Sequence, residues 1–467
     1  PTQIEPVQYQ AKEIGNRLYF WCGEKEIRCG MQWTLEFSLG EDDNYLTQRA
    51  SFYNPSQKSH AWMSWSNAAL PVREDSELHF PGGNILYHGS EMKEFYWDDK
   101  KKHYIRDFDS MAGFFWNDAT ENAFGVFTPS LGTGLYHIAD EKDVPGIKLW
   151  TYGIGSEEIW SYNTTIRNES YVEIQAGPIK DQSIKDELHP GQHKTYCEYW
   201  IPTTKALELS ELVLPNPELI PLEEMPRFDW TATREKVKPW VELVDAFNRG
   251  ATAKIPNPPE LHVNAWPPSG MAELGEAIPW AAKNVSVELA DTWEYYLGLW
   301  LAGCDRFDEA LEVLADVEND FARLIEARIY LAEKNQPEEC ISVLSRMQNL
   351  TLMTHPQVVI EKDKALERLG KETLVERAFW LDKLSALKDE GIIERRCQLL
   401  FDQGKFQDAK EMLEATNFTL VHQRYFRTEL WMRINKKLGV DADKNFLESL
   451  GEDRLAKFGQ YRVYDSE

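Results

Sequence analysis

The hydrophobic pattern of this 467-residue sequence changes once, between about residues 205 and 230. Before that point, short runs rich in Tyr, Trp, Phe, Val and Thr alternate with turns of Gly, Asn, Asp and Pro, which is typical of strands. Beyond it, apolar residues recur at helical spacing. One core rarely serves a chain of this length. We therefore expect a β domain over residues 1–205, a Pro-rich linker over 206–228 and a helical domain over 229–467.

The strand-like runs of the first 205 residues have no helical period between them. Such a density of short strands favours an antiparallel sandwich or barrel. His79 and His88, on either side of a Gly-Gly pair, are predicted to lie in loops. The clearest predicted strands are 17–21, 32–39, 45–53, 61–68, 123–128, 134–138, 171–176 and 193–201.

The second half repeats a helix, a tight turn and another helix. The predicted turns, which are 32, 35 and 34 residues apart, fall at Gly303, Asn335, Gly370 and Gly404. We expect these residues to end the first helix of each pair in left-handed geometry. The small Ala310 and Ala409 then allow the second helix to pack closely. This period resembles the tetratricopeptide (TPR) unit, and an irregular helical bundle is the alternative.

Charge and composition exclude several classes of function. The net charge of -26 opposes binding to nucleic acids and to anionic membranes, both of which need clustered Lys and Arg. No run approaches the roughly 20 apolar residues of a membrane-spanning helix. The six cysteines are dispersed without a CxxC pair, so we expect reduced thiols in a cytoplasmic protein rather than disulfides or a zinc site.

No sequence motif indicates a cofactor. GxxxxGK[ST], a GxGxxG after a strand, HExxH and GxSxG are all absent from the sequence. We therefore predict that the protein uses neither a cofactor nor a metal.

The segment from 134 to 200 carries the richest chemistry. A strand over 171–176 places Tyr171, Glu173 and Gln175 on one face and leaves the opposite face apolar. Carboxylates and amides bind vicinal hydroxyls, and a carboxylate can also act as a general base. On a neighbouring strand Lys148 and Trp150 share one face, and Trp160 follows. Because aromatic rings stack on the C–H faces of sugars, this group predicts a carbohydrate site.

His137 is the most interesting histidine, because it precedes Asp140 at a predicted strand end. An imidazole beside an aspartate could serve as a general acid. A structural histidine is an equally good interpretation. His137 and Asp140 could also be two ligands of a metal, but no third ligand stands out.

Two segments carry a resemblance to a known superfamily. The sequences "YVEIQAGPIKDQ" and "LHPGQHKTYCEYWIP" resemble the C-terminal strands of galactose mutarotases (aldose 1-epimerases). There, a Leu-Glu-Thr-Gln strand is followed by a Pro-Asp turn and a Pro-Gly turn. The resemblance places the catalytic base of that superfamily on Glu173, with Gln175 two residues later.

The first 205 residues more closely resemble a bacterial family of unknown function that is fused to TPR repeats. The shared segments are "WSNAA" at 65–69, "HIAD" at 137–140, "PGIKLWTYG" at 145–153 and "EIQAG" at 173–177. The resemblance implies a galactose mutarotase-like antiparallel β-supersandwich with a sugar site in the concave face of one sheet. A full domain of that type has further N-terminal strands, which are either outside this sequence, lost or supplied by another chain.

These observations give two hypotheses. In the favoured one, the protein is an enzyme acting on a glycoside or free sugar, a glycoside hydrolase or an aldose 1-epimerase. Its catalytic residues are Glu173, His137 and Asp140. Asp181 is a second candidate for the partner carboxylate of a hydrolase. The substrate-binding residues are Trp65, Asn67, Lys148, Trp150, Trp160 and Gln175.

In the alternative, the sandwich only binds a glycan, and the TPR-like domain mediates a protein–protein interaction. A carboxylate without a catalytic partner within reach would favour this second hypothesis. The helices could also brace the β domain through their tryptophans, Trp266, Trp280, Trp293 and Trp300. The expected partners are a carbohydrate ligand and a protein bound by the helices, and a homodimer is left open.

Overall fold

The computed structural model of the chain describes residues 7–26, 29–56, 58–88, 92–108, 112–151, 170–180, 186–231, 235–416 and 421–440. The chain forms two compact units. The first, here called the β unit, comprises Pro1–Glu26 and Met31–Asp229. The second, the helical unit, comprises Ile27–Gly30 and Trp230–Glu467.

The described strands of the β unit pair antiparallel throughout. Their bounds are β1 Gln8–Ile14, β2 Arg17–Lys25, β3 Gln32–Gly40, β4 Leu46–Tyr53, β5 His60–Trp62, β6 Ser66–Pro71, β7 Glu77–His79, β8 Gly83–His88, β9 Met92–Trp97, β10 His103–Tyr104, β11 Ala112–Ala119, β12 Ala123–Thr128, β13 Thr133–Ala139, β14 Gly146–Thr151, β15 Tyr171–Gly177, β16 Asp186–Leu188 and β17 His193–Thr203.

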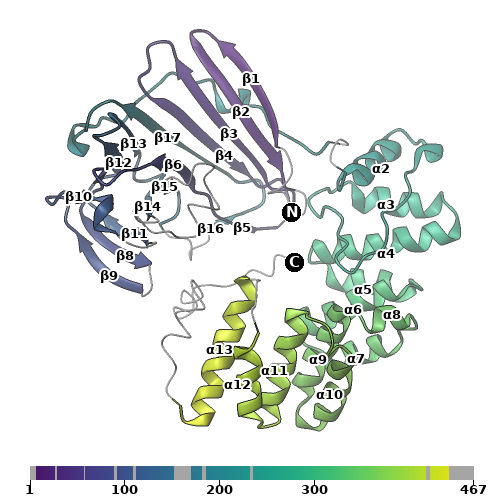
Figure 1. The fold of residues 1–467 in the computed structure, drawn as a ribbon. Helices are drawn as coiled ribbons and strands as arrows, with labels where there is room; N and C mark the ends of the chain where they lie inside the picture. Colours follow the sequence, from purple (N-terminus) through teal and green to yellow (C-terminus); the bar gives the residue numbers. More distant parts are fainter. Residues whose placement is uncertain are drawn as a thin grey trace. The chain divides into compact units, whose positions relative to one another are not determined.

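These strands form two large sheets (Figure 1). The nine-stranded sheet has the order β1-β2-β3-β4-β17-β13-β12-β7-β10, and the six-stranded sheet has the order β6-β15-β14-β11-β8-β9. Strands β16 and β5 form a separate pair. The predicted antiparallel sandwich followed by a helical domain is therefore confirmed.

Two local predictions differ from the structure. The run 61–68 forms two strands, β5 and β6, with Met63–Trp65 between them as a connection. His79 and His88 end strands β7 and β8 rather than lying in loops, because Gly83, the second glycine of the pair between them, already begins β8.

The main core of the β unit lies between the two large sheets. Ile85, Phe114, Leu149 and Ile174 from the six-stranded sheet are fully buried in this core, as is Phe124 from the nine-stranded sheet. Complete burial of such side chains stabilises the fold by about 1.5–3 kcal/mol each. The core therefore fixes which face of each strand points outward.

Residues 206–228 belong to the β unit. Ile220 and Phe228 are buried in one cluster with Tyr19 and Trp21, which β2 directs away from the main core. Backbone groups of this segment are also held, because Arg49 Nη1 donates to the carbonyl of Ile220 at 2.9 Å. The predicted linker is thus an extended strap on the outer face of the nine-stranded sheet.

The helical unit is a row of helices in which successive members pack on one another (Figure 1). Their bounds are α2 Lys238–Asn248, α3 Leu274–Lys283, α4 Val287–Gly303, α5 Phe307–Asp316, α6 Asp320–Arg328, α7 Pro337–Ser345, α8 Leu350–Met353, α9 Pro356–Leu369, α10 Leu374–Lys383, α11 Glu390–Asp402, α12 Phe406–Glu414 and α13 Val421–Leu438. A π-helical turn over Ile329–Glu333 extends α6.

The predicted left-handed helix ends are found at Asn335 and Gly404, with φ angles of 50° and 78°. Gly370 also has a positive φ. Gly303 is different, because α4 continues through it and Asp305 adopts the left-handed conformation with φ of 59°. Aspartate tolerates this conformation better than most residues. As predicted, the two repeat alanines, Ala310 and Ala409, are fully buried.

The tryptophans considered for bracing the β domain pack inside the helical unit. Trp293 and Trp300 are buried in its first core cluster, and Trp266 and Trp280 pack against that cluster. This packing accounts for the apolar character of the four residues within the helical unit.

Candidate functional site

Strand β15 has the two-faced pattern that its sequence predicts. Val172, Ile174 and Ala176 are fully buried in the main core. Glu173 and Gln175 alternate with them and therefore lie on the opposite, outward face of the six-stranded sheet. The core side fixes the register, since a shift by one residue would bury the carboxylate and expose the aliphatic side chains.

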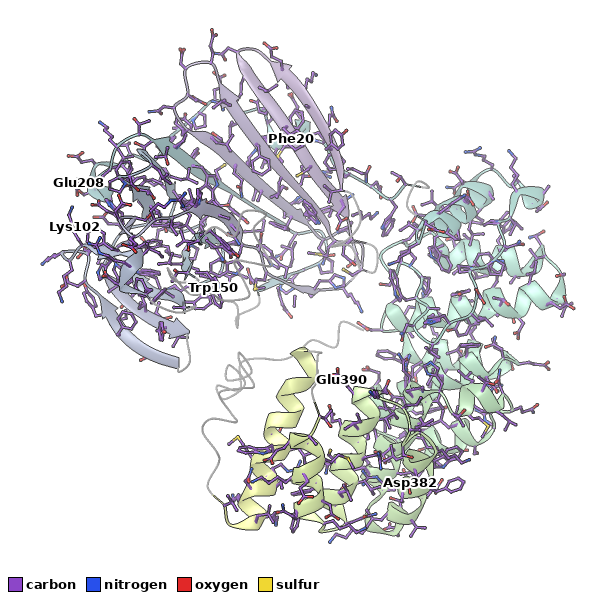
Figure 2. The ribbon with its side chains drawn as sticks, in the orientation of Figure 1. Phe20, Lys102, Trp150, Glu208, Asp382 and Glu390 are labelled. Atoms are coloured by element: carbon purple, nitrogen blue, oxygen red, sulfur yellow. The ribbon has the colours of Figure 1, made fainter. Side chains whose placement is uncertain are left out.

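Strands β14 and β6 flank β15 and bring further predicted residues to the same face. Glu173 is opposite Trp150 on β14, and Gln175 is opposite both Lys148 on β14 and Asn67 on β6. We call these five residues the β15 strip. Figure 2 labels Trp150 as a reference point for this strip on the β unit.

Hydrogen bonds fix the carboxylate of Glu173. Its Oε2 atom accepts from Asn67 Nδ2 at 2.8 Å and from Gln175 Nε2 at 2.9 Å. Its Oε1 atom has no hydrogen-bond partner among the described residues. Because one oxygen takes both amide donors, the carboxylate is held in one orientation, and among the described residues no donor occupies its second oxygen.

Lys148 lies beside two aromatic rings of the same face. Its Nζ atom is 4.9 Å from the ring centroid of Phe115 and 5.2 Å from that of Trp150, and the residue is only 4% exposed. Ammonium groups at these distances are attracted by the negative face of an aromatic ring. The lysine therefore holds the Trp150 indole next to Glu173.

Trp65 borders the strip from the connection before β6. Its ring lies so close to Gly177 that a Cβ there would approach two ring atoms to 3.2 and 3.4 Å. It also meets Phe115 edge to face, with ring centroids 6.4 Å apart. Because Gly177 has no side chain, the Trp65 indole can pack at this end of the strip.

The structure does not bring His137 to Glu173. His137 lies on β13 of the nine-stranded sheet and points into the main core, where it is fully buried. Its ring stacks on Phe124 and meets Trp200 edge to face, each at 4.7 Å. The predicted acid–base pair of His137 and Glu173 is therefore not formed, because the two side chains lie on different sheets and different faces.

Asp140 is also separate from the strip. It is exposed in the turn after β13, where its side chain accepts from the backbone N–H of Lys142 at 2.9 Å. Its carbonyl accepts from the N–H groups of Asp143 and Val144. Asp140 therefore stabilises a turn, and it is not paired with His137 as predicted.

Trp160 and Asp181, two further predicted site residues, lie outside the described residues. Among the described residues, no three His, Cys, Asp or Glu side chains gather as a metal site would require. The six cysteines are all free thiols. Within the same part of the chain, none of the helices combines the length and apolarity needed to span a membrane.

Sequence reasoning missed the residue that engages His137. Glu198 on β17 is fully buried, and its Oε1 atom lies 3.2 Å from His137 Nε2 and 2.6 Å from Ser66 Oγ. Its Oε2 atom accepts from Gln48 Nε2 at 2.9 Å. The period-two pattern of 196–200 could have revealed it, since it places this glutamate on one face with Tyr196 and Trp200.

The buried polar cluster around Glu198 lies on the core side of β6, opposite to the face that carries the strip. Ser66, which bonds Glu198, is followed by Asn67, which bonds Glu173 on the other face of β6. Nearby, Tyr196 donates to Ser64 Oγ at 3.1 Å, and burial raises the pKa of the Tyr196 hydroxyl. The network therefore anchors β6 from the inside while Asn67 reaches outward.

Comparisons with known proteins agree with this two-part structure. Residues 1–203 match the family model of a domain of unknown function, DUF5107, and residues 240–434 match the model of a C-terminal domain. A TPR-domain-containing protein from Parabacteroides distasonis is 44% identical, with a TM-score of 0.80, over 95% of this chain and 76% of that chain. The chain belongs to the same family as this TPR-domain-containing protein. The predicted resemblance to a family of unknown function whose β domain is fused to TPR repeats is thereby confirmed.

Two more distant structures are each similar to less than half of the chain. A putative mutarotase from Salmonella typhimurium is 9% identical with a TM-score of 0.34, over 43% of this chain and 65% of that one. A putative aldose 1-epimerase from Escherichia coli K12 is 11% identical with a TM-score of 0.33, over 42% of this chain and 68% of that one. Similarity at this level carries no inference about activity.

Proposed function

We propose that the β unit is a carbohydrate-binding domain and that the β15 strip is its binding site. The observation that carries this proposal is the hydrogen bonding of the Glu173 carboxylate. Its carboxylate is fixed through one oxygen by Asn67 and Gln175, while the other oxygen has no partner among the described residues. A fixed, available acceptor beside an indole ring is the combination that sugar hydroxyls and C–H groups require.

Each residue of the strip has a defined part in this proposal. Glu173 Oε1 accepts hydrogen bonds from one or two ring hydroxyls. The Trp150 indole, which is opposite Glu173 in the strand pairing, packs against the apolar face of the same sugar ring. Asn67 and Gln175 position the carboxylate, and Lys148 positions the indole through its cation–π contact.

Binding explains the described geometry better than catalysis does. Hydrolysis of a glycosidic bond uses two carboxyl groups about 5–10 Å apart, and Asp140, the described candidate for the second carboxyl group, lies in the turn after β13 and not on the strip. Mutarotation needs an acid as well as a base, and His137 is buried on the other sheet. The protein-interaction role of the helical unit stays a prediction.

A panel of mono- and oligosaccharides, titrated calorimetrically into the full chain, tests this proposal. We expect at least one neutral sugar to bind, and Trp150→Ala to weaken its affinity at least tenfold. Tyr96→Ala is the matched control, because Tyr96 is an exposed aromatic residue, 57% accessible, on β9 of the same sheet. Equal affinities for wild type and Trp150→Ala would contradict the proposed site.

The same panel also distinguishes binding from turnover. Each sugar that binds is incubated with the wild-type chain and followed by polarimetry and by release of reducing ends. A carbohydrate-binding domain leaves optical rotation and reducing ends unchanged. Steady turnover that Glu173→Gln abolishes would instead support the enzyme hypothesis.

A further inference from the structure

A cavity lies at the far end of the β unit from β1, where the nine-stranded sheet ends in β7 and β10. It has a volume of about 300 Å³, at the lower end of the range for small-molecule pockets. Most of its lining comes from β7 and the two residues after it, the segment from Trp97 to His103, and residues 206–210 of the strap, and Glu121 adds to it from the connection between β11 and β12. None of its lining residues belongs to the β15 strip.

The floor of the cavity is aromatic and rigid. Trp97 and Phe80 line it and are only 1% and 2% exposed. His103 packs on Trp97 with ring centroids 4.0 Å apart, and its Nε2 atom is bonded to the carbonyl of Asp98 at 2.9 Å. The indole N–H of Trp97 is buried without a hydrogen-bond partner among the described residues.

Hydrogen bonds also fix the wall made by the strap. The hydroxyl of Tyr136 accepts from the backbone N–H of Leu207 at 3.0 Å and lies 3.1 Å from His79 Nδ1. His79 Nε2 in turn is 3.1 Å from a carboxylate oxygen of Glu77. The cavity is therefore preformed, because both the strap and β7 are held in place.

The rim carries charges of both signs. Three consecutive lysines line the cavity together with four carboxylates, from Glu77, Asp99, Glu121 and Glu208. The lysines are Lys100, Lys101 and Lys102, and Figure 2 shows the last of them on the same side of the β unit as Glu208.

The existing ion pairs at this rim are weak. Lys102 Nζ is 3.4 Å from a carboxylate oxygen of Glu77, and the lysine side chain is 73% exposed. Lys101 pairs with Asp98 at the same distance and with the same exposure. Exposed pairs of this kind contribute little to stability, so a ligand with matching charges can replace them.

The two signs of charge restrict what can fill the cavity. A ligand that covers the rim removes water from ammonium and carboxylate groups, which is costly unless the ligand supplies countercharges. An anion would pair with the lysines but be repelled by the carboxylates. A cation would pair with the carboxylates but be repelled by the lysines. We propose that this cavity binds a small zwitterion of the α-amino acid class, with its carboxylate toward Lys102 and its ammonium toward Glu208.

This second site is independent of the proposed carbohydrate site. The experiment is a calorimetric titration of the full chain with L-tryptophan, L-leucine, L-glutamine and L-lysine, each compared with its N-acetyl and its amide derivative. We expect at least one free amino acid to bind, and both derivatives to bind at least tenfold more weakly because each lacks one of the two charges.

Variants at the rim complete the test. Lys102→Gln and Glu208→Gln should each weaken binding at least fivefold, and both positions are exposed enough to leave folding intact. Glu173→Gln should leave amino-acid binding unchanged, so failure of the carbohydrate proposal does not affect this result. Absence of binding by all four amino acids at millimolar concentration, equal binding of the derivatives, or unchanged affinity in both rim variants would overturn the proposal.

Discussion

The side-chain amide of Gln175 lies 2.9 Å from Oε2 of Glu173, two residues earlier on the same outward face of β15. The i, i+2 spacing of a strand makes this contact possible, because both side chains emerge on one face about 7 Å apart along the chain. Asn67 reaches the same oxygen from β6. A local sequence pattern and a long-range strand pairing thus converge on one carboxylate oxygen.

The buried network around Glu198 is expected to dominate the stability of the β unit. Glu198→Ala leaves His137, Ser66 and Gln48 without their shared acceptor in a closed core. The expected loss in the free energy of unfolding is about 3 kcal/mol or more. Urea denaturation followed by fluorescence measures it.

The control for this experiment is Glu187→Ala. Glu187 lies on β16 with a side chain that is 65% exposed, so the urea midpoint should stay unchanged. A Glu198→Ala midpoint equal to that of the control would mean that the network does not stabilise the fold.

Much of this arrangement follows from local sequence. Period-two alternation over 171–176 predicts which side chains of β15 face outward, and the core residues Val172 and Ile174 enforce that choice. The repeat period in the second half predicts the helical row. The one displaced helix end, at Asp305 instead of Gly303, shows that a residue tolerant of left-handed geometry can replace glycine nearby.

Strand order was beyond the reach of sequence reasoning. His137 and Glu173 each have the residue type for a catalytic pair, but β13 pairs with β17 in one sheet while β15 pairs with β6 and β14 in the other. The pairings of β13 with β17 and of β15 with β6 join segments that are far apart in the sequence, and no local pattern encodes them. The contact between His137 and Glu198 could not be predicted for the same reason, because it depends on the pairing of β13 with β17.

The strap over 206–228 depends on Arg49. This buried guanidinium donates to the carbonyl of Ile220 and, at 2.8 Å, to the fully buried carboxylate of Glu36. Arg49→Met should release the strap and leave Glu36 with Trp21 Nε1 as its remaining donor among the described residues. We expect the strap to be cleaved at least tenfold faster in limited proteolysis.

Arg73→Met is the control for strap release, because Arg73 is exposed and its Nη1 bonds the adjacent carbonyl of Val72. Cleavage should then proceed as in the wild type. If Arg49→Met is also cleaved at the wild-type rate, the strap does not depend on Arg49, and its other contacts hold it, among them the hydrogen bonds from the Ile220 N–H to the Tyr19 hydroxyl and from the Thr34 hydroxyl to the Pro226 carbonyl.

Tyr136 makes the stability of the β unit sensitive to high pH. Burial raises the pKa of its hydroxyl to about 12, against about 10 in an unfolded chain. Since the unfolded state loses this proton first, the stabilising contribution is complete below pH 10 and is lost as the pH rises towards 12. Urea midpoints at pH 9, 10 and 11 should fall less steeply in Tyr136→Phe.

Part of that slope should remain in the variant, because burial also raises the pKa of Tyr199 to about 12. The Tyr136→Phe chain should be less stable than wild type at pH 9, by about 1 kcal/mol, through loss of the hydrogen bond to Leu207. Identical slopes for the two chains between pH 9 and 11 would contradict the account of Tyr136.

The most direct test of the account concerns Glu173 itself. For the tightest neutral sugar found in the panel, calorimetry compares wild type with Glu173→Gln and with Glu94→Gln, an exposed glutamate on β9 of the same sheet. A carbohydrate-binding strip predicts at least a tenfold loss of affinity in Glu173→Gln and wild-type affinity in Glu94→Gln. Wild-type affinity in Glu173→Gln would contradict it.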